Sequence, residues 1–175
     1  MRTTTLQSAL VTVTEKLVQQ LQQFTPAAFV IKPNEQCWSA AEVAEHLLIV
    51  SKNVTRVLQA DGAVPDRAPD AKLAVIQEAL LDRATRREAP DNVRPTGSMQ
   101  DQQELITGLQ KQMQLLAQVV EEKEQNELCA IYPHPRLGRL TRLEWAYFIV
   151  YHTERHCKQM EDIRSQVLTN VGAKP

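Results

Sequence analysis

The chain has 175 residues, of which 43% are hydrophobic and 23% charged, values typical of a single globular domain that buries a core without disulfides. Its 20 basic side chains face 21 acidic ones, so no net field favours DNA, RNA or an anionic membrane surface, and we expect no nucleic-acid partner. No stretch approaches the roughly 20 apolar residues that span a bilayer, so we expect no membrane partner either.

The first third of the chain predicts two amphipathic helices. The first covers about residues 3–24, where apolar residues recur at three- and four-residue spacing until Pro26 breaks the chain. The second begins with an S-x-x-E capping box formed by Ser39 and Glu42. We expect Gly62 to end this helix as its C-terminal cap.

A long connection follows, in which a shorter helix is predicted over about residues 70–88. The turn-rich segment 89–98 ends at Ser98, which we expect to cap the third long helix. The apolar stripe of that helix continues to about Glu124.

The last predicted helix begins in the same way as the second. Thr141 and Glu144 form a T-x-x-E capping box, and the helical pattern continues to about Thr169. Four long amphipathic helices with connections of intermediate length predict an all-α four-helix bundle with a short extra helix in the crossover. We expect one domain over residues 1–175.

The inward face of the last helix carries polar residues at three successive positions. In chain order this face consists of Trp145, Ile149, His152, His156, Gln159, Ile163 and Val167. A polar group buried without a partner costs about 1–3 kcal/mol, so three in succession need a shared explanation. Metal coordination supplies one.

Two histidines on this face, His152 and His156, are four residues apart, so both imidazoles can reach one ion. A third, His46, lies on the core stripe of the second predicted helix. Three histidine ligands leave a coordination position open, as in catalytic rather than structural zinc sites. We therefore predict a metal site formed by these three residues. The alternative is that each histidine is satisfied separately by a backbone carbonyl.

Two further residues are candidates for a catalytic role. Gln159 lies one turn beyond His156 and can hydrogen-bond a ligand imidazole or bound water, or else a neighbouring backbone group. His134 lies in a Pro-His-Pro loop, where it is a candidate acid/base group or substrate contact, or else a solvated loop histidine. Cys157 points about 100° away from His156 around the helix, so we do not expect it to bind the ion.

The remaining candidates have simpler structural readings. Arg86, Arg87 and Arg94 near the crossover are possible contacts for an anionic substrate, but a solvated face explains them better. Three cysteines are present without the spacing of a disulfide framework or a cysteine zinc site. The N-terminus has no basic segment followed by an unbroken apolar one. We expect a cytoplasmic protein with reduced thiols.

Three segments carry a family resemblance in their sequence and in their order along the chain. They are WSAAEVAEHL at 38–47, APDNVRPTG at 89–97 and HPRLGRLTRLEWAYFIVYHTERHCKQ at 134–159. With them, the chain resembles the DinB-like (DinB/YfiT) superfamily of metal-binding four-helix bundles. The resemblance covers nearly the whole chain.

The resemblance implies specific roles. The first metal histidine of the family falls on His46, its H-x-x-x-H pair on His152 and His156, and the glutamine after the pair on Gln159. Members commonly bind zinc or nickel and are often dimeric. Those with known reactions include metal-dependent thiol S-transferases and a thiol-dependent maleylpyruvate isomerase. The resemblance thus implies a divalent metal, a low-molecular-weight thiol, a small-molecule substrate and a homodimer.

Two classes of function follow from these features. The first is a metal-dependent enzyme: a thiol S-transferase acting on a small electrophilic molecule, or a hydrolase that uses hydroxide at the same ligands. The second is a non-enzymatic stress protein that binds a metal or small ligand. No inward carboxylate identifies a general base, so the sequence does not choose between the thiol transferase and the hydrolase.

Overall fold

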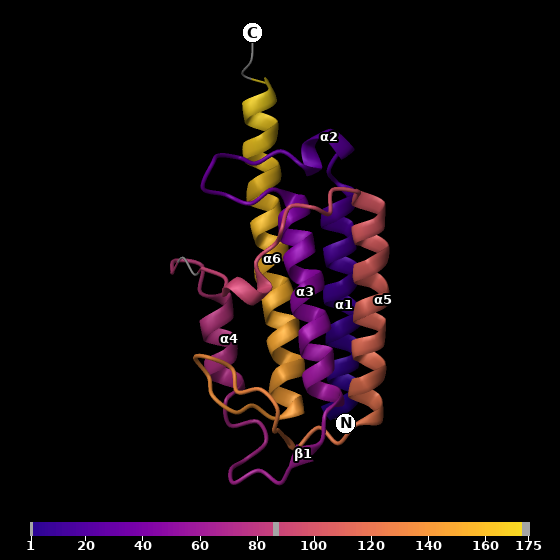
Figure 1. The fold of residues 1–175 in the computed structure, drawn as a ribbon, viewed down its shortest axis with the longest axis vertical. Helices are drawn as coiled ribbons and strands as arrows, with labels where there is room; N and C mark the ends of the chain where they lie inside the picture. The colour runs from indigo at the N-terminus through magenta and orange to yellow at the C-terminus, as the bar shows by residue number, and fades with distance from the viewer. Residues whose placement is uncertain (1, 86–87, 173–175) are drawn as a thin grey trace.

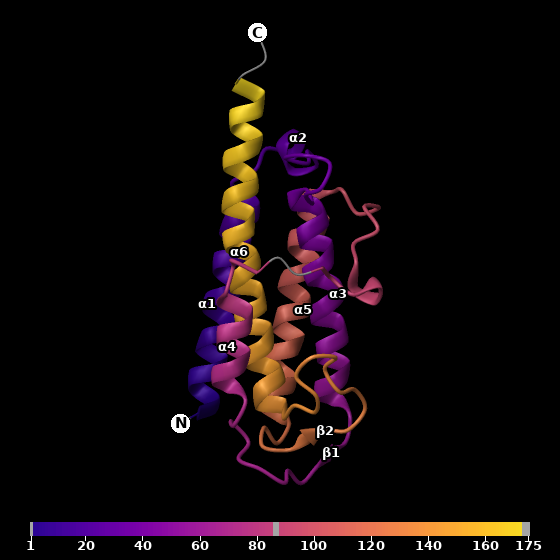
Figure 2. The ribbon, with the colours of Figure 1, turned by 90° about the vertical axis from the view of Figure 1, so that its left-hand side faces the viewer.

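The computed structural model describes residues 2–85 and 88–172. Four long helices lie side by side along the long axis of the molecule (Figure 1): α1 (Arg2–Gln22), α3 (Ala40–Gln59), α5 (Gln102–Glu122) and α6 (Arg142–Gly172). α3 contacts α5 and α6, and α1 contacts the same two helices. The chain runs in one direction through α1 and α6 and in the other through α3 and α5 (Figures 1 and 2). The predicted all-α four-helix bundle is confirmed.

The connection between α3 and α5 crosses the length of the bundle and contains α4 (Leu73–Leu81) and the 3-10 turn η1 (Asp91–Val93). α4 packs against α6, as Figure 2 shows. The extra crossover helix is therefore confirmed, but it is shorter than the predicted 70–88. It ends because the Asp82 carboxylate accepts hydrogen bonds from the backbone N–H of Ala84 and the hydroxyl of Thr85, which close a turn.

Three short elements were not predicted. Thr25 caps a single turn, α2 (Pro26–Phe29), with Pro26 at its first position, where a missing N–H has no cost. At the other end of the bundle β1 (Gly62–Ala63) pairs antiparallel with β2 (Leu128–Cys129). Within the described part of the chain, no helix combines the length and apolar character needed to cross a membrane.

Two predicted helix caps are wrong. α3 ends at Gln59 with Ala60 in an extended conformation, and Gly62 instead lies in β1. A Cβ atom at Gly62 would lie 2.2 Å from a carboxylate oxygen of Glu127, so glycine permits the close approach of these two segments of the chain. The cap of α5 is not Ser98 but Asp101, whose carboxylate accepts the backbone N–H of Glu104.

The starts of the two site-bearing helices are confirmed. Ser39 and Glu42 exchange backbone and side-chain hydrogen bonds of 3.2 and 2.9 Å at the start of α3. Thr141 and Glu144 do the same at the start of α6, at 3.0 and 3.2 Å. Arg67 adds a bidentate ion pair to the buried Glu144 carboxylate, with both N–O distances 2.6 Å. These bonds fix where the inward face of each helix begins.

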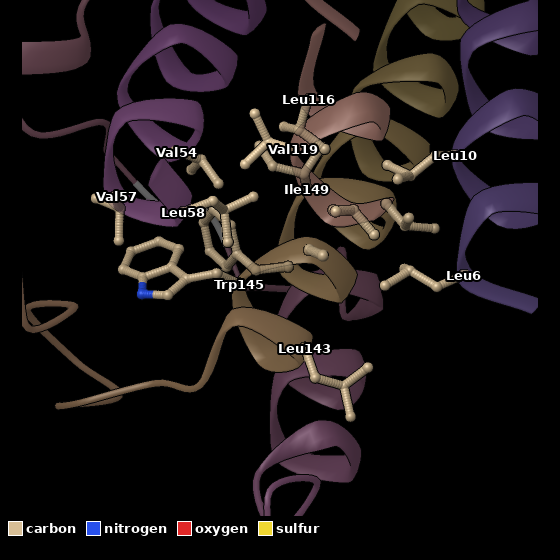
Figure 3. Packing of buried hydrophobic residues seen from close by; sticks show 14 of the residues in the cluster. Leu6, Leu10, Val54, Val57, Leu58, Leu116, Val119, Leu143, Trp145 and Ile149 are labelled. Atoms are coloured by element: carbon tan, nitrogen blue, oxygen red, sulfur yellow. The ribbon is translucent and has the colours of Figure 1, made fainter. Parts of the chain in front are cut away.

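The buried apolar residues form two clusters along the bundle. In the first, Trp145 of α6 lies beside Val57 of α3, with side chains of α1 and α5 completing the layer (Figure 3). On α6 this cluster ends at Val150, and the second begins at Cys157. His152 and His156 fall at the boundary between the two clusters, so the polar positions interrupt the core at one level only.

Trp145→Ala is expected to lower the free energy of unfolding by about 3–5 kcal/mol, because Trp145 is only 3% exposed and its truncation leaves a cavity in the core. Denaturant titration measures this change. Leu168→Ala, at a position 60% exposed, is the control and should stay within about 0.5 kcal/mol of wild type. If Trp145→Ala lowered the free energy of unfolding no more than the control does, the first cluster would not depend on Trp145.

Candidate metal centre

Three imidazole rings from α3 and α6 converge on one point. The Nε2 atom of His152 lies 3.4 Å from Nε2 of His46 and 3.3 Å from Nε2 of His156. All three candidate ligand atoms lie within 4.8 Å of one another. Within residues 2–85 and 88–172 this is the one group of three or more His, Cys, Asp or Glu side chains with such geometry. The structure thus brings together the three histidines that the sequence predicted as ligands.

The outer nitrogens of two rings have hydrogen-bond acceptors. Nδ1 of His46 lies 2.7 Å from the carbonyl oxygen of Val93, and Nδ1 of His156 lies 2.7 Å from Oε1 of Gln159. Both Nδ1 atoms must donate a proton, so both Nε2 atoms carry lone pairs that face His152. An acceptor behind a ligand histidine fixes the tautomer that binds a metal.

Burial lowers the pKa of all three rings. The pKa of His156 falls to about 3, through burial first and the neighbouring His46 next. Burial also lowers the pKa of His152, reinforced by the neighbouring His156 and His46. For His46 the bond to the Val93 carbonyl only partly opposes burial. The rings are neutral at pH 7, the form that coordinates metals.

These residues fit a divalent metal ion. Nitrogens bound at about 2.0–2.1 Å to one tetrahedral zinc lie about 3.3–3.4 Å apart, which matches the two separations at His152. A proton on Nε2 of His152 could satisfy one of the two facing lone pairs but not both, whereas a cation satisfies all three nitrogens. In the described structure Nδ1 of His152 is buried without a hydrogen-bond partner.

Aromatic rings line two sides of the three histidines. Trp38 lies against His46, with ring centroids 5.1 Å apart. Phe148 stacks on His152 at 5.4 Å, with the ring planes 15° apart. Their apolar surfaces cover part of the His46 and His152 imidazoles, and less polar surroundings strengthen electrostatic interactions at the site. Trp38 and Phe148 therefore each contact one of the three histidines.

His134 lies beside Phe148 and is not one of the three histidines whose nitrogens converge. Its ring contacts Phe148 and Trp145, with centroids 5.1 and 5.6 Å away. Its Nδ1 accepts the backbone N–H groups of Arg136 and Leu137, both at 3.2 Å. The proton of the neutral ring is therefore on Nε2, which makes His134 a hydrogen-bond donor at neutral pH.

The other predicted residues divide clearly. Gln159 hydrogen-bonds the imidazole of His156, which is one of the contacts predicted for it from the sequence. Cys157 points into the second apolar cluster, away from the three histidines, as predicted, and burial raises its pKa to about 12. Arg94 is exposed and bonds to Ala89 of its own segment, the solvated arrangement that was the alternative to a substrate contact. Arg86 and Arg87 lie outside the described residues.

Two residues of the site were missed in the sequence. Val93 contributes only a backbone carbonyl, which leaves no trace in the residue type. Glu45 is buried beside His46, and its carboxylate accepts hydrogen bonds from Thr96 and Gly97. The signal for Glu45 in the sequence was an acidic residue directly before the candidate ligand His46, on the inward side of the predicted helix.

Burial and the nearby charge of Arg136 lower the pKa of His134 to about 4. Its ordinary pKa is about 6.5, so as pH falls between these values the unfolded chain takes up the proton first, and His134 favours unfolding there. We expect the stability advantage of wild type over His134→Gln to shrink between pH 7 and about 4.5. Denaturant titrations at the two pH values, with NMR titration of the ring, measure this. A His134 titration near its ordinary pKa would contradict it.

Comparison with known proteins places the chain in a family. The profile of the DinB superfamily matches residues 9–160. The uncharacterized protein YuaE of Bacillus subtilis (strain 168) is 26% identical over 140 residues, which cover 78% of this chain and 83% of that protein. The crystal structure of TT2238, a four-helix bundle protein, shares the fold with a TM-score of 0.59 at 21% identity, covering 91% of this chain and 98% of that one. The chain belongs to the DinB superfamily.

Proposed function

We propose that this protein binds one divalent metal ion, zinc or nickel, through His46, His152 and His156 and transfers a thiol sulfur to a small electrophilic molecule. The observation that carries the proposal is the convergence of three Nε2 atoms, with separations at His152 that suit a shared ion. Three protein ligands leave a position for an external group. The choice of a thiol follows the family resemblance.

The surroundings of the three histidines favour a thiol over water as the nucleophile. A water-based hydrolase needs a carboxylate or similar base near the ligands. Glu45 is the buried carboxylate next to His46, but both its oxygens already accept hydrogen bonds from the segment 89–97. Those bonds hold the carboxylate against the segment, and Glu45 is not among the side chains that converge with the three histidine nitrogens, so it is not placed to take a proton from water there. A thiol, with a pKa of about 8.5, needs less help to ionise.

In this reaction the thiol sulfur attacks an electrophilic carbon, a carbon–sulfur bond forms, and the leaving group departs with its bonding electron pair while the thiol proton passes to solvent. When bound, a divalent ion supplies a Lewis acid that lowers the pKa of the thiol and favours the anionic sulfur. The protein holds three neutral donors, two of them in tautomers fixed by an acceptor behind the ring, and it packs Trp38 and Phe148 against the imidazoles of His46 and His152.

His134 and Gln159 have different parts in this proposal. His134 presents an Nε2–H group next to Phe148, so we assign it a substrate contact as donor; its occupied Nδ1 does not suit a general base. Gln159 holds the His156 ring through Nδ1 and so positions a ligand instead of touching substrate.

Purified protein is expected to retain about one zinc or nickel ion per chain, and His152→Ala should lose most of it, because His152 joins the other two ligands. Elemental analysis measures the metal content. His134→Ala is the matched control, since it removes the remaining histidine of the chain without touching the three converging nitrogens, and it should keep its metal. Retention should fall only at pH values well below the ordinary imidazole pKa of about 6.5, because burial lowers the pKa of all three rings. A wild-type protein without metal after reconstitution would overturn the proposal.

Addition of a low-molecular-weight thiol to cobalt-substituted protein should produce a sulfur-to-metal charge-transfer band, because a soft sulfur anion suits a borderline ion. Absorption spectroscopy detects the band. His46→Ala should abolish it, whereas Cys157→Ser should keep it, since that thiol is buried in the second apolar cluster. If cobalt binds and no thiol gives a band, plain metal binding or hydrolysis replaces thiol transfer.

A further inference from the structure

Glu45 joins α3 to the crossover segment 89–97. The residue is 3% exposed. Its Oε1 accepts hydrogen bonds from the backbone N–H of Thr96 at 3.0 Å and from the Thr96 hydroxyl at 2.6 Å, and its Oε2 accepts the N–H of Gly97 at 2.9 Å. Gly97 has a φ of 73°, a left-handed conformation that glycine adopts without strain. One buried carboxylate thus holds two successive residues of the segment.

The same segment supplies the acceptor for His46. The Val93 carbonyl, at the end of η1, lies 2.7 Å from Nδ1 of His46. Neighbouring residues on a helix point about 100° apart, so Glu45 and His46 contact the segment at different places while His46 faces α6. The Val93 carbonyl and the Glu45 bonds therefore belong to one connection between α3 and the crossover.

The segment also packs against the bundle through the Val93 side chain, which lies against the first apolar cluster. Its polar side chains are mostly exposed, among them Asp91, Asn92 and Arg94. Arg94 bonds to Ala89 and pairs with Glu88 and Asp91, which shapes the segment without joining it to the bundle. Segments with few buried contacts open at a low free-energy cost. The three bonds to a buried carboxylate are therefore a large share of what holds the Val93 carbonyl against His46.

We propose that Glu45 is a positioning residue of the metal centre, which holds the segment 89–97 so that the Val93 carbonyl keeps His46 in its metal-binding tautomer. The inference rests on the proposed metal binding for its effect on affinity, but its effect on the His46 tautomer is independent of metal. A buried carboxylate that served only to stabilise the fold would leave both properties unchanged in a folded variant.

The test compares zinc affinity, measured by competition with a chelating dye at pH 7, in wild type and Glu45→Gln. The amide nitrogen of glutamine cannot accept an N–H bond, so part of the connection breaks. We expect zinc affinity to fall about tenfold, the range found when acceptors behind ligand histidines are removed. Nitrogen NMR of the metal-free proteins should show His46 in the Nδ1–H form in wild type and in mixed tautomers in the variant.

Two controls separate positioning from general loss of stability. Ser39→Ala removes the cap of the same helix without touching the segment 89–97, and it should keep wild-type zinc affinity and the wild-type His46 tautomer. Thr96→Ala removes the hydroxyl bond to Glu45, together with the bonds of that hydroxyl to Ser98, and should lower affinity by a smaller factor; it carries the test if Glu45→Gln does not fold. Ser98→Ala, which loses a bond to Thr96 and none to Glu45, is its control.

Each outcome decides between the two proposals. Unchanged affinity and an unchanged His46 tautomer in Glu45→Gln, or in Thr96→Ala if that variant carries the test, overturn the role of Glu45. An equal fall in Ser39→Ala does so as well, because helix stability would then explain the result. Absence of zinc binding in wild type overturns the proposed function instead, and the tautomer measurement on metal-free protein still decides the role of Glu45.

Discussion

Nε2 of His152 lies 3.4 Å from Nε2 of His46 and 3.3 Å from Nε2 of His156, and both of these neighbouring histidines are buried. Two nitrogen lone pairs that face each other repel, and the repulsion is stronger where water cannot screen it. The acceptors behind His46 and His156 prevent both rings from turning a proton inward. The proposed metal ion would reconcile these contacts, because a positive charge between the rings attracts all three nitrogens. The convergence depends on α3, which carries His46, on α6, which carries His152 and His156, and on the crossover segment, which supplies the Val93 carbonyl.

The bundle meets that requirement by fixing the helices at their starts and packing them on both sides of the site. The reciprocal caps at Ser39 and Thr141 set where the inward face of each helix begins. The Arg67–Glu144 pair ties the start of α6 to the crossover. Apolar clusters above and below the histidines supply the burial that stabilises the bundle, so the polar layer needs to contribute little of its own. The fold can therefore hold three ligands in place without losing its core.

The helices and the three histidines could be predicted because each has a side-chain signature. Capping boxes and three- and four-residue spacing identify helix starts and inward faces from the residue types alone. The wrong caps and the missed site residues have a different cause, because they depend on features that the residue types do not reveal. Gly62 looked like a helix cap, but only the approach of Glu127 from a distant segment explains it. Ser98 and Asp101 are equally good caps, and the sequence does not rank them. The Val93 carbonyl has no side-chain signature at all.

A crystal structure of the zinc- or nickel-loaded protein, with anomalous diffraction recorded at the absorption edge of the metal, tests the central claim most directly. We expect one anomalous peak per chain, about 2.0–2.1 Å from Nε2 of His46, His152 and His156 if zinc is bound. The Nδ1 atoms of His46 and His156 should keep their bonds to Val93 and Gln159. No peak at these three nitrogens in crystals of metal-loaded protein, or a peak held by other residues, would contradict the assignment of this site.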